Sequence, residues 1–99
     1  MAKVAWTAEA HLWLRDIHDY IAAENPAAAE RVALAIFDSV RVLHEHPRLG
    51  QRYLYVTDRE VRMLHHSHYR IVYLIREDTG DVDILGVFHG ALPIERYLV

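Results

Sequence analysis

The sequence lacks cysteine and long apolar runs, and each absence removes a class of protein. Without cysteine the chain has no disulfide, no thiolate metal site and no thiol nucleophile, a composition that suits the reducing cytosol. No apolar stretch approaches the ~20 residues that cross a bilayer, and the N-terminus has no apolar segment typical of a signal peptide. We therefore expect a cytoplasmic protein with no membrane partner.

Internal repeats, low-complexity tracts and linkers are also absent. The chain of 99 residues is 53% hydrophobic, which is enough apolar material to bury one core without covalent crosslinks. These features predict a single domain over residues 1–99.

Excess positive charge is missing as well, because the formal net charge is −3. A nucleic-acid-binding domain is typically strongly basic, so we expect no direct specific DNA binding. The charge is unevenly distributed: residues 8–46 hold seven acids and three arginines, residues 47–76 hold two acids and six arginines, and residues 77–99 hold five acids and one arginine. The basic central segment indicates either a surface for a polyanion or an acidic peptide, or an ordinary solvated sheet face.

The first half of the sequence has helical periodicity. Thr7 is a candidate N-cap, and apolar residues recur every three or four positions over residues 8–23, which predicts an amphipathic helix. Asn25 and Pro26 end that helix and start another over residues 26–46, which stops at the HPRLG segment. The two helices should form an antiparallel hairpin.

The second half changes to a period of two, typical of strands. We predict strands at residues 59–66, 69–77 and 82–89, with a glycine-containing turn at 78–81 and a loop, short helix or packed tail at 90–99. A short strand also precedes the first helix. This order predicts an α+β fold in which the helical hairpin covers one face of an antiparallel sheet and leaves the other face open to a partner.

Four fragments, in the same order and at similar spacing, resemble the ParE-type toxins of the ParE/RelE superfamily. They are YIAAENPAAAER at 20–31, LHEHPRLG at 43–50, YRIVY at 69–73 and ILGVFHG at 84–90. The resemblance covers nearly the whole chain. It implies the toxin of a type II toxin–antitoxin pair, silenced when the acidic and apolar tail of a cognate antitoxin docks on it and covers the helical hairpin.

The superfamily divides by target, and the two targets require different residues. RelE-like members cut messenger RNA on the ribosome, whereas ParE-like members act on DNA gyrase. By resemblance to the nucleases, Arg62 and Arg70 would stabilise the phosphate, and His89 or Tyr97 would carry protons.

The end of the last predicted strand departs from the nuclease pattern. Residues 90–93, GALP, stand where the nucleases carry further basic residues, and VFHG at 87–90 resembles ParE-like toxins and their plasmid-stabilisation relatives. We therefore expect a gyrase inhibitor that is not an enzyme, with a ribosome-dependent endoribonuclease as the alternative. A non-toxic family member that acts only as a binding partner is the third reading.

Candidate partner-binding residues come from the basic segment and the end of the last strand. They are Arg59, Arg62, Arg70, Arg76 and His89. The arginines have a structural alternative in pairing with Glu60, Glu77 or Asp83. The eight histidines include one dense cluster, at 65–68, but its spacing fixes no third ligand, so we expect neither a metal nor another cofactor.

Overall fold

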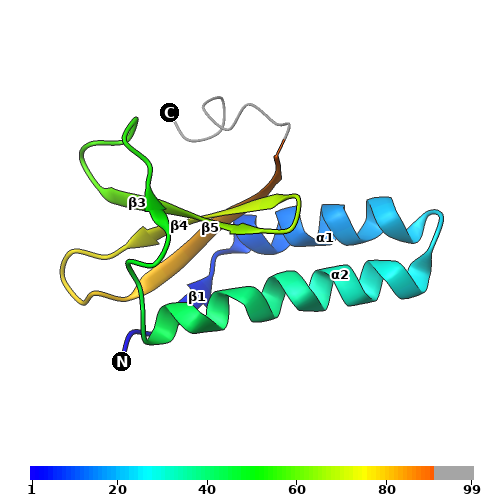
Figure 1. Cartoon of the computed structure of the whole chain (residues 1–99), viewed down its shortest axis with the longest axis horizontal. Helices are drawn as coiled ribbons and strands as arrows, with labels where there is room; N and C mark the ends of the chain where they lie inside the picture. The colour runs from blue at the N-terminus through cyan, green and yellow to red at the C-terminus, as the bar shows by residue number, and fades with distance from the viewer. Residues whose placement is uncertain (91–99) are drawn as a thin grey trace.

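The structure, a computed structural model, describes residues 1–90. Two helices lie against one side of a five-stranded sheet (Figure 1), which confirms the predicted α+β class and the helical hairpin on one sheet face. The predicted tail at 90–99 lies almost wholly outside the described residues. The elements are β1 (Val4–Trp6), α1 (Ala8–Ala22), α2 (Pro26–Ser39), the 3-10 helix η1 (Val40–His44), β2 (Gln51–Arg52), β3 (Glu60–His66), β4 (Tyr69–Ile75) and β5 (Val82–His89).

Helix α1 begins where the sequence predicts and ends one residue earlier. The Thr7 hydroxyl accepts a hydrogen bond from the Ala10 amide at 3.1 Å and donates one to the Ile84 carbonyl at 2.8 Å. One side chain therefore caps the helix and fastens its start to β5. Neither helix of the described part has the length and apolar content that crossing a membrane requires.

Helix α2 is shorter than predicted. Asn25 caps it by accepting from the Ala28 amide, but the α-helix ends at Ser39 and a 3-10 helix continues to His44. The Ser39 hydroxyl donates to the Ile36 carbonyl at 2.7 Å, the acceptor that an α-helix would give to the Val40 amide. The chain therefore tightens into the i→i+3 winding common at helix ends.

The sheet order is β1-β5-β4-β3-β2, and only the β1–β5 pair is parallel. The three predicted antiparallel strands are present, although β3 starts one residue late and β4 ends two residues early. Two-residue strand β2 was not predicted, because a strand that short has no readable alternation. Gly80 adopts φ +77° in the β4–β5 turn, the left-handed region open to glycine.

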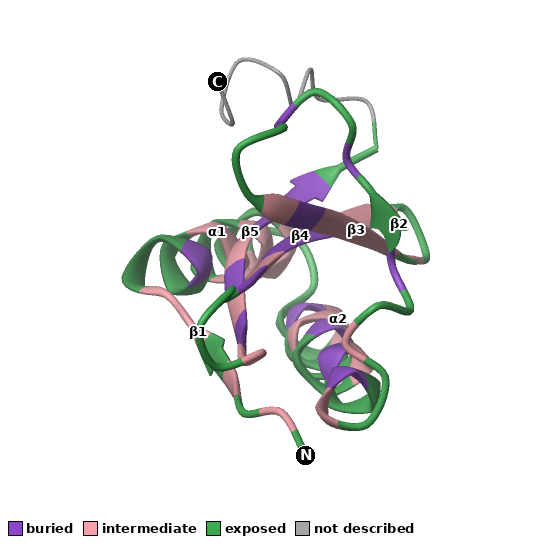
Figure 2. Cartoon of the chain, turned by 90° about the vertical axis from the view of Figure 1, so that its left-hand side faces the viewer, coloured by how far each residue is buried: buried purple, intermediate pink, exposed green. Residues whose placement is uncertain are grey.

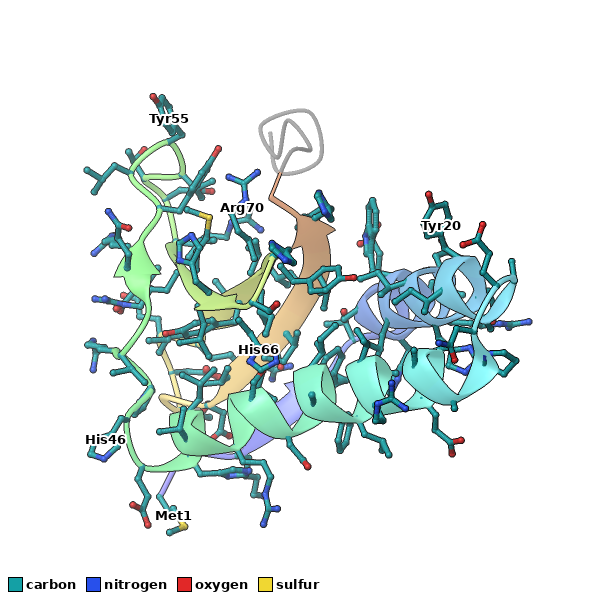
Figure 3. All side chains as sticks on the ribbon, turned by 45° about the vertical axis from the view of Figure 1, so that its right-hand side comes forward. Met1, Tyr20, His46, Tyr55, His66 and Arg70 are labelled. Carbon is teal, nitrogen blue, oxygen red and sulfur yellow. The ribbon has the colours of Figure 1, made fainter. Side chains whose placement is uncertain are left out.

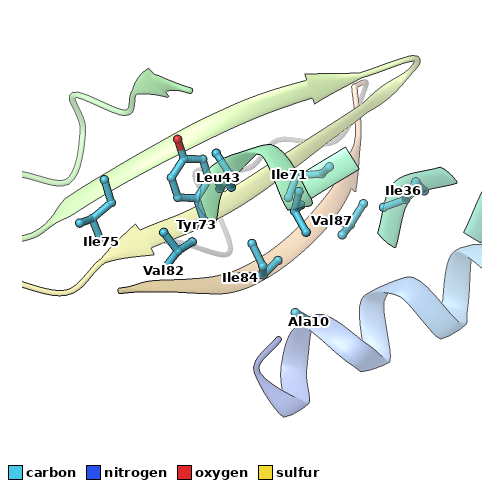
Figure 4. Packing of buried hydrophobic residues seen from close by; sticks show 10 residues of the cluster. Ala10, Ile36, Leu43, Ile71, Tyr73, Ile75, Val82, Ile84 and Val87 are labelled. Carbon is cyan, nitrogen blue, oxygen red and sulfur yellow. The ribbon is translucent and has the colours of Figure 1, made fainter. Parts of the chain in front are cut away.

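The main core lies between the helices and the sheet (Figure 4). Alternate residues of β4, and Val82, Ile84 and Val87 of β5, where a register shift breaks the alternation, point into it and meet the buried faces of both helices and η1. Its fully buried large side chains are Ile36, Leu43, Ile71, Tyr73, Val82, Ile84 and Val87.

A second, smaller cluster occupies the other face of the sheet. Val61, Val72 and Phe88 are buried there together with Tyr53 and Val56, which belong to the loop between β2 and β3. Figure 2 shows short buried stretches in this loop, which is otherwise exposed. The expectation that this face is open is therefore wrong over these strands. The helices cover only the first face of the sheet, so the apolar side chains on the second face would lie in water without the loop. Folding the loop over them removes them from water.

Candidate functional site

Tyr73 holds the segment after η1 against the sheet. Its hydroxyl accepts a hydrogen bond from the Gly50 amide at 2.9 Å and donates one to the Pro47 carbonyl at 2.7 Å. Burial raises the pKa of the Tyr73 phenol, so it stays protonated and able to donate. The interaction joins two of the sequence fragments noted above, HPRLG and YRIVY.

Gly50 is required at this contact by space. A Cβ there would lie 2.6 Å from the Tyr73 hydroxyl and 2.7 Å from the Met63 carbonyl, closer than such atoms approach. The first of those neighbours is a buried side chain and the second is backbone, so neither moves easily.

Glu60 binds two arginines beside this contact. Arg48 grips its carboxylate with two hydrogen bonds, at 3.1 and 3.2 Å, and Arg62 adds a third at 2.7 Å. Burial favours the neutral acid, but the hydrogen bonds and charges of Arg62 and Arg48 outweigh it, so the pKa of Glu60 lies below its usual value. Arg62 also donates to the Gly50 carbonyl at 2.8 Å, so its guanidinium fastens the chain before β2.

The two arginines proposed for a nuclease site lie on opposite faces of the sheet. Arg62 pairs across the strands with Tyr73, whose side chain lies in the main core. Arg70 lies opposite Phe88, a member of the second cluster. The structure does not bring these two cations to one surface.

His89 lies at the end of β5, on the helix-facing side with its strand partner Tyr69. The two rings meet edge to face with centroids 5.9 Å apart, and the His68 ring lies 6.4 Å from His89. Arg70 donates to the Gly90 carbonyl at 3.2 Å, which holds the chain where it leaves the strand. Tyr97, the other proton carrier considered, lies outside the described residues.

Arg59 and Arg76 do come together, at an open cleft of about 490 Å³ near the end of β4. Arg48 and Arg52 also line it. Arg76 forms an ion pair with Asp83 at 2.7 Å, which is the cross-strand pairing that the sequence offered as the structural role. Much of the positive charge of this cleft is therefore compensated.

An apolar groove of about 510 Å³ lies between α1 and the ends of β4 and β5. Most of its lining comes from Trp13, Ile17, Tyr20, Ile21, Tyr69, Val87 and His89. Asp16 is the one acidic residue at its border, and the Tyr20 side chain projects outward from the helix (Figure 3). Of the predicted partner-binding residues, His89 belongs to this groove.

The histidines do not assemble into a metal site in the part of the chain that the structure describes, since no three potential ligands meet there. His44 has a structural contact instead: its Nδ1 lies 2.7 Å from the Ala2 carbonyl. This bond joins η1 to the residues that precede β1.

Comparison with known sequences places these features in a family. Residues 4–92 match the family described as ParE toxin of type II toxin-antitoxin system, parDE. A curated relative, Toxin RelE2 of Caulobacter vibrioides, is 36% identical over 91 residues, which cover 92% of this chain and 98% of the relative. The chain belongs to the ParE toxin family.

Solved structures share the ParE-family fold. The chromosomal ParDE toxin–antitoxin system of P. aeruginosa matches with a TM-score of 0.72 at 21% identity, over 90% of this chain and 96% of the matched chain. The RelBE2 toxin–antitoxin complex of Mycobacterium tuberculosis matches with a TM-score of 0.56 at 22% identity, over 89% and 96% of the two chains.

Sequence reasoning missed the apolar groove of this ParE-family chain, although it had identified part of the helical stripe that lines it. Trp13, Ile17 and Ile21 belong to the apolar stripe over residues 8–23 from which the amphipathic helix is predicted. The signal was an extra tyrosine, Tyr20, beside that stripe, because its side chain widens the apolar face beyond what the sheet covers.

Proposed function

We propose that this protein is the toxin of a type II pair, that it inhibits DNA gyrase without cutting RNA, and that a cognate antitoxin neutralises it in the cytoplasm. The observation that carries the choice against RNA cleavage is the placement of Arg62 and Arg70 on opposite faces. Cleavage beside a 2′-hydroxyl needs cations and proton carriers gathered around one phosphate. The choice of gyrase as the protein target rests on the resemblance to ParE-like toxins.

The engagement of Arg62 also supports a target that is a protein. Its donors serve Glu60 and the Gly50 carbonyl, so binding a phosphate would break contacts that hold the fold together. On the opposite face, Arg70 lies beside the buried apolar cluster of Val61, Val72 and Phe88, whose side chains offer a phosphodiester no hydrogen-bond donor.

An antitoxin partner is supported by the structural neighbours, which are toxin–antitoxin systems. The groove beside α1 is the docking site that we assign to it, since apolar side chains of a partner would remove Tyr20 and the neighbouring Ile17 from water. No lysine or arginine lines the described groove and Asp16 stands at its border, so the apolar side chains of the tail, and not its acidic ones, would supply the contact there.

Induced expression tests the proposal. We expect growth arrest that is relieved by the neighbouring reading frame, and inhibition of supercoiling by purified gyrase. Arrest accompanied by prompt cleavage of translated messages, mapped by primer extension, would contradict it, and an Arg70→Ala variant would then show whether cleavage uses Arg70.

Matched variants on α1 test the groove. Tyr20 is 85% exposed and lines the groove, whereas Leu12 is 57% exposed on the same helix and does not line it. We expect Tyr20→Asp to weaken antitoxin binding at least tenfold, about 1.4 kcal/mol, and Leu12→Asp to leave it unchanged. Equal effects of the two substitutions in calorimetry would remove the groove from the antitoxin interface.

A further inference from the structure

The loop between β2 and β3 exposes two large apolar side chains next to each other. Leu54 is 75% exposed and Tyr55 is 74% exposed, although Tyr53 and Val56 on either side are buried. We call Leu54 and Tyr55 the loop tip. Tyr55 points away from the body of the molecule, at the other end from Tyr20 (Figure 3).

The loop tip is presented on an anchored base. The Tyr53 amide donates to the Val61 carbonyl at 2.8 Å, and the side chains of Tyr53 and Val56 pack in the second cluster. The ring of Tyr55 lies 5.4 Å from that of Tyr53, centroid to centroid, which braces it from below. Because the base is already ordered, a partner that covers the tip loses less affinity to ordering it.

Arginines flank the loop tip on both sides. Among the described residues the Arg52 guanidinium has no ion pair, and Arg59 meets only its neighbour Asp58, at 3.7 Å, with 48% of its own side chain exposed. Both belong to the segment 47–76, whose six arginines exceed its two acids. Helix α1, which lines one side of the groove, comes from the acidic segment 8–46 and places Asp16 at the groove's border, so the charge there is opposite to that beside the loop tip.

We propose that the loop tip is the surface that engages the target protein, by inserting Leu54 and Tyr55 into an apolar pocket bordered by carboxylates. This inference rests on the proposed function and assigns the target and the antitoxin to different ends of the toxin. Tyrosine and arginine are the residues that dominate protein interfaces, and flanking cations steer an acidic partner into place.

Two sets of variants test the loop tip. The first is the double substitution Leu54→Ser, Tyr55→Ser, and its control is Leu12→Ser, Leu34→Ser, which removes two exposed apolar side chains, 57% and 58% exposed, from the helices. Each purified toxin is measured for inhibition of gyrase supercoiling, for antitoxin affinity by calorimetry and for melting temperature. We expect the tip variant to need at least tenfold more protein for half inhibition, with antitoxin affinity and melting temperature unchanged, and the control to match wild type.

A charge variant separates steering from insertion. Arg52→Glu with Arg59→Glu should slow association with purified gyrase about tenfold at low salt, and the difference should shrink as salt rises. Unchanged association at every salt concentration would refute the acidic border of the partner's pocket.

Other outcomes are distinguishable. Full gyrase inhibition by the tip variant refutes the loop tip alone, and an equal loss of antitoxin affinity assigns the tip to the antitoxin interface. If the wild type is a dimer in light scattering and the tip variant is a monomer, the loop tip belongs to a self-association interface and the proposal is overturned. Wild-type protein that arrests growth without inhibiting gyrase refutes gyrase as the target. In that case, loss of the arrest in the tip variant supports the loop tip as the target-binding surface, and a tip variant that still arrests growth refutes it. A wild type that leaves growth unaffected refutes both proposals.

Discussion

The two faces of the sheet are covered by very different means. Helices α1 and α2 cover the first face, where ten buried residues form one cluster. On the second face the buried cluster has five residues, and the loop after β2 contributes only Tyr53 and Val56 to it. On the first face the helices leave the apolar groove beside α1, whereas the short loop on the second face leaves its own apex, Leu54 and Tyr55, in water. The comparison explains why Leu54 and Tyr55 are exposed.

The largest expected effect on the free energy of unfolding comes from truncating one buried side chain in each of the two clusters. Leu43 is fully buried in the helix-facing cluster, and Leu43→Ala should lower the free energy of unfolding by about 3–4 kcal/mol. Val56 lies at the margin of the second cluster, where the loop can settle into the space, so Val56→Ala should cost about 1 kcal/mol. Denaturant unfolding with an unchanged m-value measures both. Equal losses would mean that the loop is as integral to the fold as the helices are.

Next in size is the removal of one hydroxyl from the helix-facing side. Tyr73→Phe leaves the Gly50 amide and the Pro47 carbonyl without their partner, which should cost about 2 kcal/mol. Tyr20→Phe, at an exposed hydroxyl, should change stability by less than about 0.5 kcal/mol. A Tyr73→Phe protein as stable as wild type would show that water replaces the hydroxyl there.

A smaller effect depends on pH. The pKa of Glu60 is lowered in the folded protein, so its stabilising contribution is present above the usual value of 4.5 and is lost as the pH falls through the lower folded pKa. Glu60→Gln should cost about 1 kcal/mol at neutral pH and less under acid conditions, where wild type loses the same interaction. Urea unfolding from pH 7 to pH 3 measures the difference, and a constant difference across that range would contradict it.

The smallest effect is expected far from both faces, at the hairpin between the helices. Asn25 accepts from the Ala28 amide at 3.1 Å in an exposed position. Asn25→Ala should cost about 0.5–1 kcal/mol, and Asn25→Asp should retain the cap and most of the stability. Thermal unfolding of the pair measures the cap, and identical losses would mean that the side-chain bond is not what stabilises the turn.

The fold was readable from the sequence where the signal was local. Thr7, Asn25 and Pro26 mark helix starts by their own side chains, and the period-two pattern of β4 is contained in seven residues. The failures came where distant parts decide. Strand β2 exists because two residues meet the edge of β3, far along the chain. The early end of α2 is a different kind of failure, because the hydrogen bond of the Ser39 hydroxyl to the Ile36 carbonyl that marks it is local.

The candidate sites divide in the same way. The basic character of segment 47–76 and the arginine candidates could be named from the sequence, but their faces could not. The register of β4 with its two neighbours, which places Arg62 opposite Tyr73 and Arg70 opposite Phe88, determines that these two arginines lie on different faces. The apolar groove required α1 to meet the ends of β4 and β5, and no periodicity within any one of these elements predicts that they meet.

By itself the sequence determined the order and type of the main elements, the uneven charge and the family, because each is encoded in neighbouring residues or in motifs kept along the chain. Only the tertiary structure decided that Arg62 binds Glu60 and the Gly50 carbonyl, that a loop covers the second sheet face and that the tip of this loop stays in water. Those outcomes depend on strand register and on which segments pack together, which are set by contacts between residues far apart in the chain.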